Sequence, residues 1–305
     1  MKKTSKPIVF FGSGPVAAES LRLLARDFTI EAVVTKPRAP HHRGPVPVIE
    51  LAEALQLPIY TVENKSTLDT LIDQDPFQAE LGVLIDFGII VSQKVIDYFP
   101  LGIINSHFSI LPEWRGADPI TFSILSGQPD TGVSLMLLTA GMDEGPLIAY
   151  GSYDLPPAIT TPELTDGLID LSHALLIEMI PQHIEKQLQG IDQRVTSRDE
   201  SYSRKLTKDD GTLDWTKPAA VLEREIRAFI EWPKSRAKLG TVEAIITKAH
   251  VAKDSGKAGS TTIIDKLPAV YTADGAFIID RLKPMGKKEM TGEAFLAGYK
   301  HAFLN

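Results

Sequence analysis

The sequence contains no cysteine, which excludes disulfide bonds, cysteine-ligated zinc, iron–sulfur clusters and thiol nucleophiles. It also lacks an apolar run of about 18 residues, the length that a membrane-spanning helix requires. The apolar run 8–11 near the N-terminus is too short for the core of a secretion signal. We therefore expect a cytoplasmic protein that does not act at a membrane.

The remaining composition is that of an ordinary globular protein, with 43% hydrophobic and 23% charged residues in a chain of 305. This length indicates two domains or one large domain. The net charge of −7 is unevenly distributed. Residues 201–305 contain 18 Lys and Arg against 13 Asp and Glu, whereas residues 1–200 contain 14 against 26. A basic second half is compatible with nucleic-acid binding, although an imbalance of this size also arises by chance.

Short apolar runs alternate with amphipathic stretches over the first 150 residues or so, as in a parallel sheet covered by helices on both faces. The sequence predicts strands at 8–11, 30–34, 58–61, 81–85, 102–106 and 133–138, and helices at 15–25 and 48–55.

The second half of the chain first continues with helices and then changes character. A helix is expected to begin at Thr161, and Pro181 should kink or break it. Another helix is expected at 218–230. Beyond Gly240, short β-rich runs separated by turn residues predict a small β-barrel or meander.

Two glycine-containing turns admit a nucleotide interpretation and a structural one. Gly12-Ser13-Gly14 opens a dinucleotide pattern, but Ala17 replaces its third glycine and no acidic residue ends the second strand, so a tight turn is favoured. Asp86-Phe87-Gly88 matches the magnesium motif of kinases without the catalytic loop that accompanies it. The second turn is better interpreted as a loop that lines a ligand crevice.

The stretch 102–119 is the densest in polar and rigid residues. Asn105 and His107 are two positions apart, so an extended chain points both side chains to the same side. An amide donor beside an imidazole can stabilise the oxyanion that forms during acyl transfer. A structural histidine is the alternative, and the residues alone leave the two interpretations evenly balanced.

Asp143 lies in the glycine-flanked turn 140–146 after the next predicted strand. Such an aspartate can simply bond its own backbone. If it instead lies near His107, its carboxylate favours the charged imidazole, and the three residues supply a donor, an acid or base and an orienting group. The adjacent His41 and His42 point to opposite sides of an extended chain, so we expect a solvated loop there and no metal site in the protein.

Two long strings then identify a family. The stretch 105–120 resembles the pattern N-x-H-x-S-L-L-P-x-W-R-G-A-x-P-I of the folate-dependent formyltransferases. Thr131-Gly132-Val133 with 141–145 resembles the T-G-V…G-x-D-x-G motif of the same family. The strings 201–206, 214–215 and 226–233 resemble the Y-x-x-K-L…D-W…I-R-A-F-x-P-W-P pattern of the members that act on an aminoacyl-tRNA.

The resemblance implies an α/β fold in which a Rossmann-like formyltransferase domain with a mostly parallel sheet precedes a small OB-like β-barrel. The implied bounds are 1–189 for the catalytic domain, 190–206 for a linker and 207–305 for a tRNA-binding domain. The implied reaction moves the formyl group of 10-formyltetrahydrofolate to the α-amine of methionine on initiator tRNA. No metal is needed, and we expect a monomer.

The family also implies roles for individual residues. Asn105 and a protonated His107 would stabilise the oxyanion, and Asp143 would keep His107 charged and help to move a proton. Folate would bind through Phe87, Gly88, Ile89, Ile90, Ser109, Ile110, Leu111, Pro112, Ala140, Gly141 and Met142. The tRNA would bind through Arg38, Arg43, Lys205, Lys208, Arg224, Arg227, Lys234, Arg236 and Lys238.

The chain departs from the family pattern at three places. Glu231 replaces the proline before Trp232, the loop 36–44 lacks the paired lysines of the family, and Asp86 replaces the alanine of A-Y-G. Two other functions stay open. One is formylation of a nucleotide amino-sugar, and the other is RNA binding by a degenerate transferase scaffold, against which the presence of Asn105, His107 and Asp143 argues.

Overall fold

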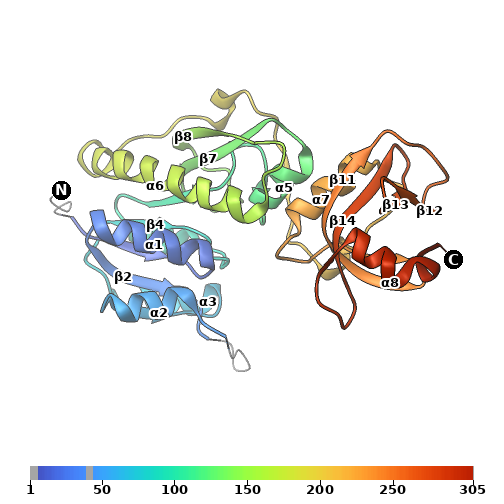
Figure 1. Ribbon diagram of the computed structural model, residues 1–305. Coiled ribbons are helices and arrows are strands. Elements are labelled where there is room, and N and C mark those ends of the chain that lie inside the picture. The colour runs from blue at the N-terminus through green and yellow to red at the C-terminus, as the bar shows by residue number, and fades with distance from the viewer. Residues whose placement is uncertain (1–5, 39–43, 305) are drawn as a thin grey trace. The chain divides into compact units, whose positions relative to one another are not determined.

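The computed structural model describes residues 6–38 and 44–304, which form two compact units (Figure 1). The first unit contains the chain up to Gly116, Asp130–Asp154 and Thr165–Tyr202. The second contains Ala117–Pro129, Leu155–Leu164 and the chain from Ser203 onward. Both units therefore draw on segments that are distant in the sequence.

The first unit is built on a seven-stranded sheet of order β3-β2-β1-β4-β5-β7-β8. Strands β1 to β5 are parallel, and β7 and β8 are antiparallel, which confirms the predicted mostly parallel α/β sheet. The strands are β1 (Ile8–Phe11), β2 (Ile30–Thr35), β3 (Ile59–Thr61), β4 (Leu81–Leu84), β5 (Ile103–His107), β7 (Asp130–Leu137) and β8 (Leu147–Asp154). The helices are α1 (Pro15–Asp27), α2 (Pro47–Ala54), α3 (Lys65–Ile72), α4 (Gln93–Tyr98) and α6 (Thr161–Lys186), with η1 at Gln193–Thr196.

We predicted a kink or a break at Pro181, and the break does not occur, because α6 continues through this residue to Lys186. A proline inside a helix costs roughly 3 kcal/mol or more, since it removes one hydrogen bond and crowds the preceding turn. Tertiary contacts on both sides of Pro181 oppose that cost. Ile180 is fully buried, and the imidazole Nε2 of His183 lies 2.8 Å from the carbonyl oxygen of Leu101. Packing therefore holds the last turns of the helix in place.

The second unit is an antiparallel half-barrel, which confirms the predicted small β-barrel domain. Its sheet has the order β10-β11-β14-β13-β12, and β15 pairs with β14. The strands are β10 (Arg236–Leu239), β11 (Val242–Ala252), β12 (Thr261–Ile264), β13 (Leu267–Tyr271), β14 (Ala276–Pro284) and β15 (Met290–Thr291), and the helices are α5 (Pro119–Ser126), α7 (Ala219–Ala228) and α8 (Gly292–Leu304), with η2 at Lys208–Gly211. Two register shifts beside Lys248 bend β11 against β14 and help to curl the sheet.

A short two-stranded sheet pairs β6 (Arg115–Gly116) with β9 (Tyr202–Ser203). The backbone N–H of Arg115 donates to the carbonyl oxygen of Ser201 at 2.9 Å. This pairing ties the stretch after β5 to a segment almost 90 residues further along the chain. The segment before Ser203 is consequently part of the first unit rather than a free connection.

The second unit buries a carboxyl group that makes its stability depend on pH. Glu225 accepts one hydrogen bond from Lys217 Nζ at 2.6 Å, and its other oxygen, Oε2, has no partner among the residues that the structure describes. Burial raises the pKa of Glu225 above its usual value, although Lys217 opposes the shift. The folded protein therefore binds this proton more tightly than the unfolded chain does, and stability is lost as pH rises from the ordinary glutamate pKa through the raised one.

Glu225→Gln is accordingly expected to increase the free energy of unfolding at pH 7.5 by about 1 kcal/mol. The gain should shrink as pH falls towards the ordinary glutamate range, since Glu225 is then neutral in the wild type as well. Loss of the ion pair with Glu225 costs Lys217 little free energy, because its side chain is 42% exposed and remains hydrated. Urea unfolding at pH 4.5 and 7.5 measures the difference, with the exposed Glu231→Gln as the control. A destabilised variant at pH 7.5 would contradict the interpretation.

Candidate active site

Strand β5 presents Asn105 and His107 on one face of the sheet. Both residues belong to β5, which ends one residue later than predicted. Their side chains are only 6% and 7% exposed. Ser106 points to the opposite face, where its hydroxyl lies 2.7 Å from that of Ser172 in α6. The alternation of side chains along an extended strand therefore explains why Asn105 and His107 are neighbours in space.

The turn between β7 and β8 brings Asp143 to the same place. Its Oδ1 accepts a hydrogen bond from Asn105 Nδ2 at 3.4 Å, and its Oδ2 accepts one from the backbone N–H of Gly116 at 2.7 Å. The same Oδ2 lies 3.7 Å from Nδ1 of His107. The structure thus brings together three polar side chains that span 38 positions of the sequence.

Both ring nitrogens of His107 lie near oxygen atoms of the chain. Its Nε2 lies 2.9 Å from the carbonyl oxygen of Trp114, and its Nδ1 faces the Asp143 carboxylate. The contact of Nε2 is within hydrogen-bond distance, whereas that of Nδ1 is longer than a hydrogen bond. Trp114 has φ of 54°, a left-handed conformation that is uncommon for a residue with a side chain. The loop thus accepts local strain at the residue whose carbonyl faces His107.

The residues predicted to bind folate divide into a buried group and a surface group. Phe87, for instance, packs edge-to-face against Phe11 in the core, with ring centres 5.6 Å apart. The buried members are Phe87, Ser109, Ile110, Leu111 and Pro112. The members at or near the surface are Gly88, Ile89, Ile90, Ala140, Gly141 and Met142. Buried residues that line a ligand would therefore do so mainly through backbone groups.

Two exposed apolar side chains stand out among the surface members. Ile90 is 73% exposed and Met142 is 62% exposed. Ile90 belongs to the loop that follows β4, whose Leu84 is paired in register with Asn105 of β5. Met142 directly precedes Asp143. Both residues therefore lie on segments that start beside the polar cluster, and both expose apolar surface.

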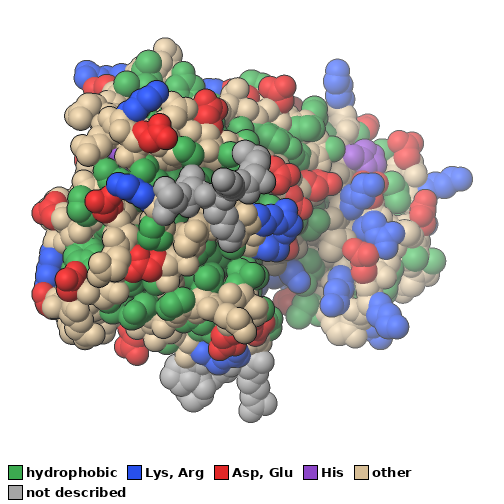
Figure 2. Space-filling view, turned by 90° about the vertical axis from the view of Figure 1, so that its left-hand side faces the viewer, with side chains coloured by type: hydrophobic (Ala, Val, Ile, Leu, Met, Phe, Trp, Pro, Cys, Tyr) green, Lys and Arg blue, Asp and Glu red, His purple; other side chains and the backbone are tan. Residues whose placement is uncertain are grey.

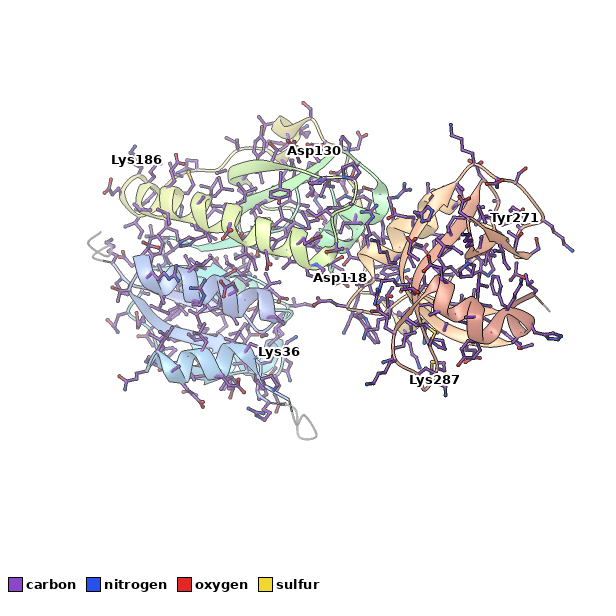
Figure 3. All side chains as sticks on the ribbon, in the orientation of Figure 1. Lys36, Asp118, Asp130, Lys186, Tyr271 and Lys287 are labelled. Carbon is purple, nitrogen blue, oxygen red and sulfur yellow. The ribbon has the colours of Figure 1, made fainter. Side chains whose placement is uncertain are left out.

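The carboxylate of Asp86 lies against the turn Gly12–Gly14. A Cβ added to Gly14 would lie 1.8 Å from Oδ2 of Asp86, so a larger residue here would have to displace that carboxylate. A negative charge at the amino end of α1 disfavours the pyrophosphate that a dinucleotide would place there, which supports the tight-turn interpretation. Lys36, labelled in Figure 3, follows β2, and its Nζ lies close to Gly88.

Two of the arginines predicted to contact tRNA hold the second unit together. Arg224 donates from Nε to the carbonyl oxygen of Leu125, and Arg227 pairs with Glu223 and donates to the carbonyl oxygen of Ile159 at 2.9 Å. These contacts fasten two segments of the unit to α7. Both arginines therefore have structural contacts, and their binding of tRNA stays a prediction.

The other predicted tRNA contacts differ in their surroundings. Arg38 donates from Nη1 to the carbonyl oxygen of Gly44 at 2.8 Å, and Arg236 donates to that of Lys208. The exposed members are Lys205, Lys208, Lys234 and Lys238. Arg43, like His41 and His42, lies outside the described residues. Figure 2 shows acidic and basic side chains interspersed over the nearer surface.

Several residues around the cluster were not predicted from the sequence. The backbone N–H of Gly116 and the carbonyl of Trp114 act through main-chain atoms, which leave no mark on side-chain patterns. Gln193 is buried and contacts the turn that carries Asp143. It lies in a polar segment without periodicity, so no sequence signal distinguished it from its neighbours.

Within residues 6–38 and 44–304, no three His, Asp or Glu side chains are grouped so that they could hold a metal ion. No helix in the described part of the chain is long and apolar enough to span a bilayer. The cluster described above joins one amide, one imidazole and one carboxylate, a set suited to stabilising an oxyanion and moving a proton.

Comparison with known families covers most of the chain. Residues 8–180 match the family described as "Formyl transferase", and residues 205–300 match "Formyl transferase, C-terminal domain". The chain is 34% identical over 300 residues to methionyl-tRNA formyltransferase of Chloroflexus aggregans, covering 95% of this chain and 96% of that protein. It is 33% identical over 305 residues to methionyl-tRNA formyltransferase of Nitrosococcus oceani, covering 95% and 92%.

Solved structures with the same fold are more distant in sequence. The N-formyltransferase of Helicobacter canadensis, in complex with folinic acid and dTDP-3-aminofucose, has a TM-score of 0.66 at 16% identity and covers 90% of this chain and 99% of its own. HypX of Aquifex aeolicus, in complex with tetrahydrofolic acid, has a TM-score of 0.62 at 15% identity over 97% of this chain. This chain spans about half the length of HypX, 48%.

Proposed function

The chain belongs to the formyl transferase family, and from this premise we propose that it moves the formyl group of 10-formyltetrahydrofolate to the α-amine of methionine on initiator tRNA. The observation that carries this proposal is the cluster of Asn105, His107 and Asp143 in a chain 34% identical to a methionyl-tRNA formyltransferase along 95% of its length. Both substrates are expected in the cytoplasm. That the enzyme acts as a monomer stays a prediction.

The reaction requires one bond to form and one to break at the formyl carbon. The unprotonated α-amine attacks this carbon and generates a tetrahedral intermediate with a negative oxygen. Collapse of the intermediate breaks the bond to N10 of the folate, and the proton released by the amine ends on that nitrogen. Protein groups are needed at two points, where the oxygen becomes negative and where the proton moves.

Asn105 and His107 can stabilise the negative oxygen. The Asn105 amide has two N–H bonds and gives one to Asp143, so the second can donate to the oxyanion. A protonated His107 would supply positive charge from a side chain that is only 7% exposed, where electrostatic stabilisation is strong. A single oxyanion donor of this kind contributes about 10²–10³ in rate.

Asp143 can assist the movement of the proton. Its carboxylate balances the charge of His107, aligns Asn105 and accepts from the backbone of Gly116. It is also the base that can take the amine proton and return it to the departing folate nitrogen, directly or through water. Ile90 and Met142 provide apolar surface against which the pterin ring can lie.

A second candidate substrate is a nucleotide-linked amino-sugar. It is favoured by the likeness in fold to the Helicobacter canadensis enzyme, whose structure contains dTDP-3-aminofucose. The C-terminal domain match and the positive charge of residues 201–305 favour tRNA, because a basic surface binds phosphate backbones.

Transfer of radiolabelled formyl groups from 10-formyltetrahydrofolate to both acceptors tests the proposal. We expect kcat/KM for methionyl initiator tRNA to exceed that for dTDP-3-aminofucose at least about a hundredfold, a difference of about 2.7 kcal/mol. Raising the salt from 50 to 200 mM should lower the value for tRNA strongly and the value for the sugar little. Efficient transfer to the sugar with none to tRNA would establish the alternative.

A further inference from the structure

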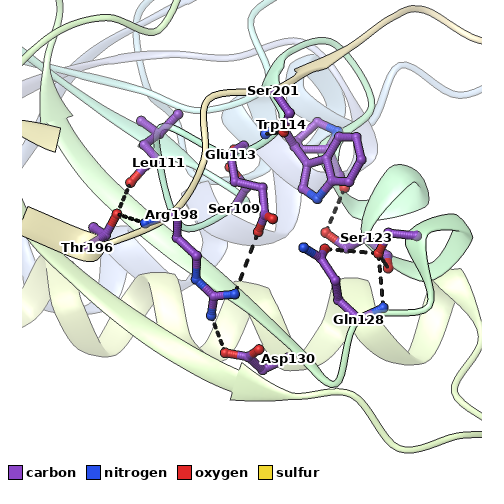
Figure 4. A network of polar contacts seen from close by, with 12 residues as sticks. Ser109, Leu111, Glu113, Trp114, Ser123, Gln128, Asp130, Thr196, Arg198 and Ser201 are labelled. Carbon is purple, nitrogen blue, oxygen red and sulfur yellow. Dashed lines mark hydrogen bonds and ion pairs between the residues drawn. The ribbon is translucent and has the colours of Figure 1, made fainter. Parts of the chain in front are cut away.

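The segment that follows η1 lies along the loop after β5 and is fastened to it at several points within the first unit. Thr196 Oγ1 donates to the carbonyl oxygen of Leu111 at 2.8 Å, and Ser201 Oγ accepts from the backbone N–H of Trp114 at 3.0 Å (Figure 4). Arg198 forms an ion pair with Asp130 and lies 4.0 Å from Oε2 of Glu113. This segment, which we predicted to be a linker, therefore belongs to the support of the polar cluster.

Gln193 occupies the position where this segment meets the turn of Asp143. Its Nε2 donates to the carbonyl oxygens of Asp143 at 2.7 Å and of Gly145 at 2.8 Å. Its Oε1 accepts from Nε and Nη2 of Arg115 at 3.2 and 2.7 Å. The side chain thus uses both of its donors and both acceptor positions, and it is 5% exposed.

The turn of Asp143 needs an external support of this kind. It contains Gly141 and Gly145, which restrict the backbone little, and Asp143 itself has φ of 52°. The separation of 3.7 Å between His107 Nδ1 and the carboxylate is longer than a hydrogen bond, so this pair does not fix the geometry alone. Gly116, whose N–H binds the carboxylate, is the residue after Arg115.

We propose that Gln193 is a positioning residue for formyl transfer, because it joins the backbone of the Asp143 turn to the Arg115 side chain of the loop that faces His107. The inference rests on the proposed function. Gln193 does not touch the reacting atoms; it fixes how Asp143 meets His107 and the Gly116 N–H. A displacement of about 1 Å in such a group can cost about a hundredfold in rate.

Gln193→Met and Gln193→Glu separate this role from general support of the fold. Methionine keeps the length of the side chain and removes all four hydrogen bonds. Glutamate keeps the acceptor for Arg115 but replaces both N–H donors by an oxygen that repels the carbonyls of Asp143 and Gly145. The control is Ser172→Ala, which removes a buried hydrogen bond on the opposite face of β5. The measurements are the single-turnover rate with saturating methionyl initiator tRNA, the dissociation constant of 5-formyltetrahydrofolate and the melting temperature.

Both Gln193 variants are expected to lose about 10- to 100-fold in single-turnover rate while the folate dissociation constant changes less than about threefold. Ser172→Ala should retain the wild-type rate although its melting temperature falls. If Gln193→Met does not yield folded protein, Gln193→Glu alone decides. Rates within twofold of wild type in a folded Gln193 variant overturn the inference, as does an equal loss in Ser172→Ala. Absence of transfer by the wild type would instead count against the proposed function.

Discussion

Asp143→Asn is expected to lower the single-turnover rate of formyl transfer by about a thousandfold or more, as the loss of an orienting carboxylate beside a catalytic histidine does elsewhere. The asparagine side chain is neutral and has one acceptor oxygen instead of two. It therefore removes the counter-charge of His107, and it cannot accept from Asn105 and from the Gly116 N–H with separate oxygens. The base that returns the proton to the folate is lost as well.

Rapid-quench measurement of the rate and fluorescence titration of 5-formyltetrahydrofolate distinguish chemistry from binding. Folate affinity should stay within about tenfold of wild type, because the lost interactions act mainly in the transition state. Glu144→Gln is the matched control, since it removes an exposed carboxylate from the next position of the same turn and should keep the wild-type rate. If rate and folate affinity fall in parallel after Asp143→Asn, the carboxylate binds the substrate instead.

Asn105→Ala is expected to lower the same rate by about 10²–10³, which is the usual contribution of one oxyanion donor. The substitution removes the amide that points at Asp143 and leaves His107 and its contact with Trp114 in place. The affinity for methionyl initiator tRNA should change little, because Asn105 is buried and the oxyanion exists only after attack.

Ser106→Ala provides the comparison for Asn105→Ala. Ser106 is the next residue of β5, equally buried, and its hydroxyl contacts Ser172 on the opposite face of the sheet. Its removal should cost about 1 kcal/mol of unfolding free energy and leave the rate unchanged. A rate loss of the same size in both variants would show that disturbance of the strand, and not the lost amide, slows the reaction.

The fold was largely predictable because its strands are short, buried and apolar throughout. Ile8–Phe11 and Leu81–Leu84 have every residue buried, and each was found as a continuous apolar run. β8 was missed because its outward-facing residues, such as Tyr150 and Ser152, alternate with partly buried ones and leave no continuous run. The error at Pro181 has the opposite origin, since local propensity predicted a break that the burial of Ile180 outweighs.

The candidate site was predictable only in part. The spacing of two between Asn105 and His107 places them on one face of a strand without any knowledge of the fold. Asp143 joined them in the prediction through the family resemblance, since no periodicity connects a turn to a strand 38 positions away. The sequence carries no signal for Gln193 either, because its side chain binds backbone atoms of a turn that is distant in the sequence.

Single-turnover rates of the wild type, Asn105→Ala, Asp143→Asn and the double variant test the central claim, which is that these side chains act as one unit on the formyl group. Groups that act together are strongly non-additive. We expect the double variant to react no more than about tenfold slower than Asp143→Asn alone. Losses that multiply in full in the double variant would contradict the account, because they would show that Asn105 and Asp143 contribute independently.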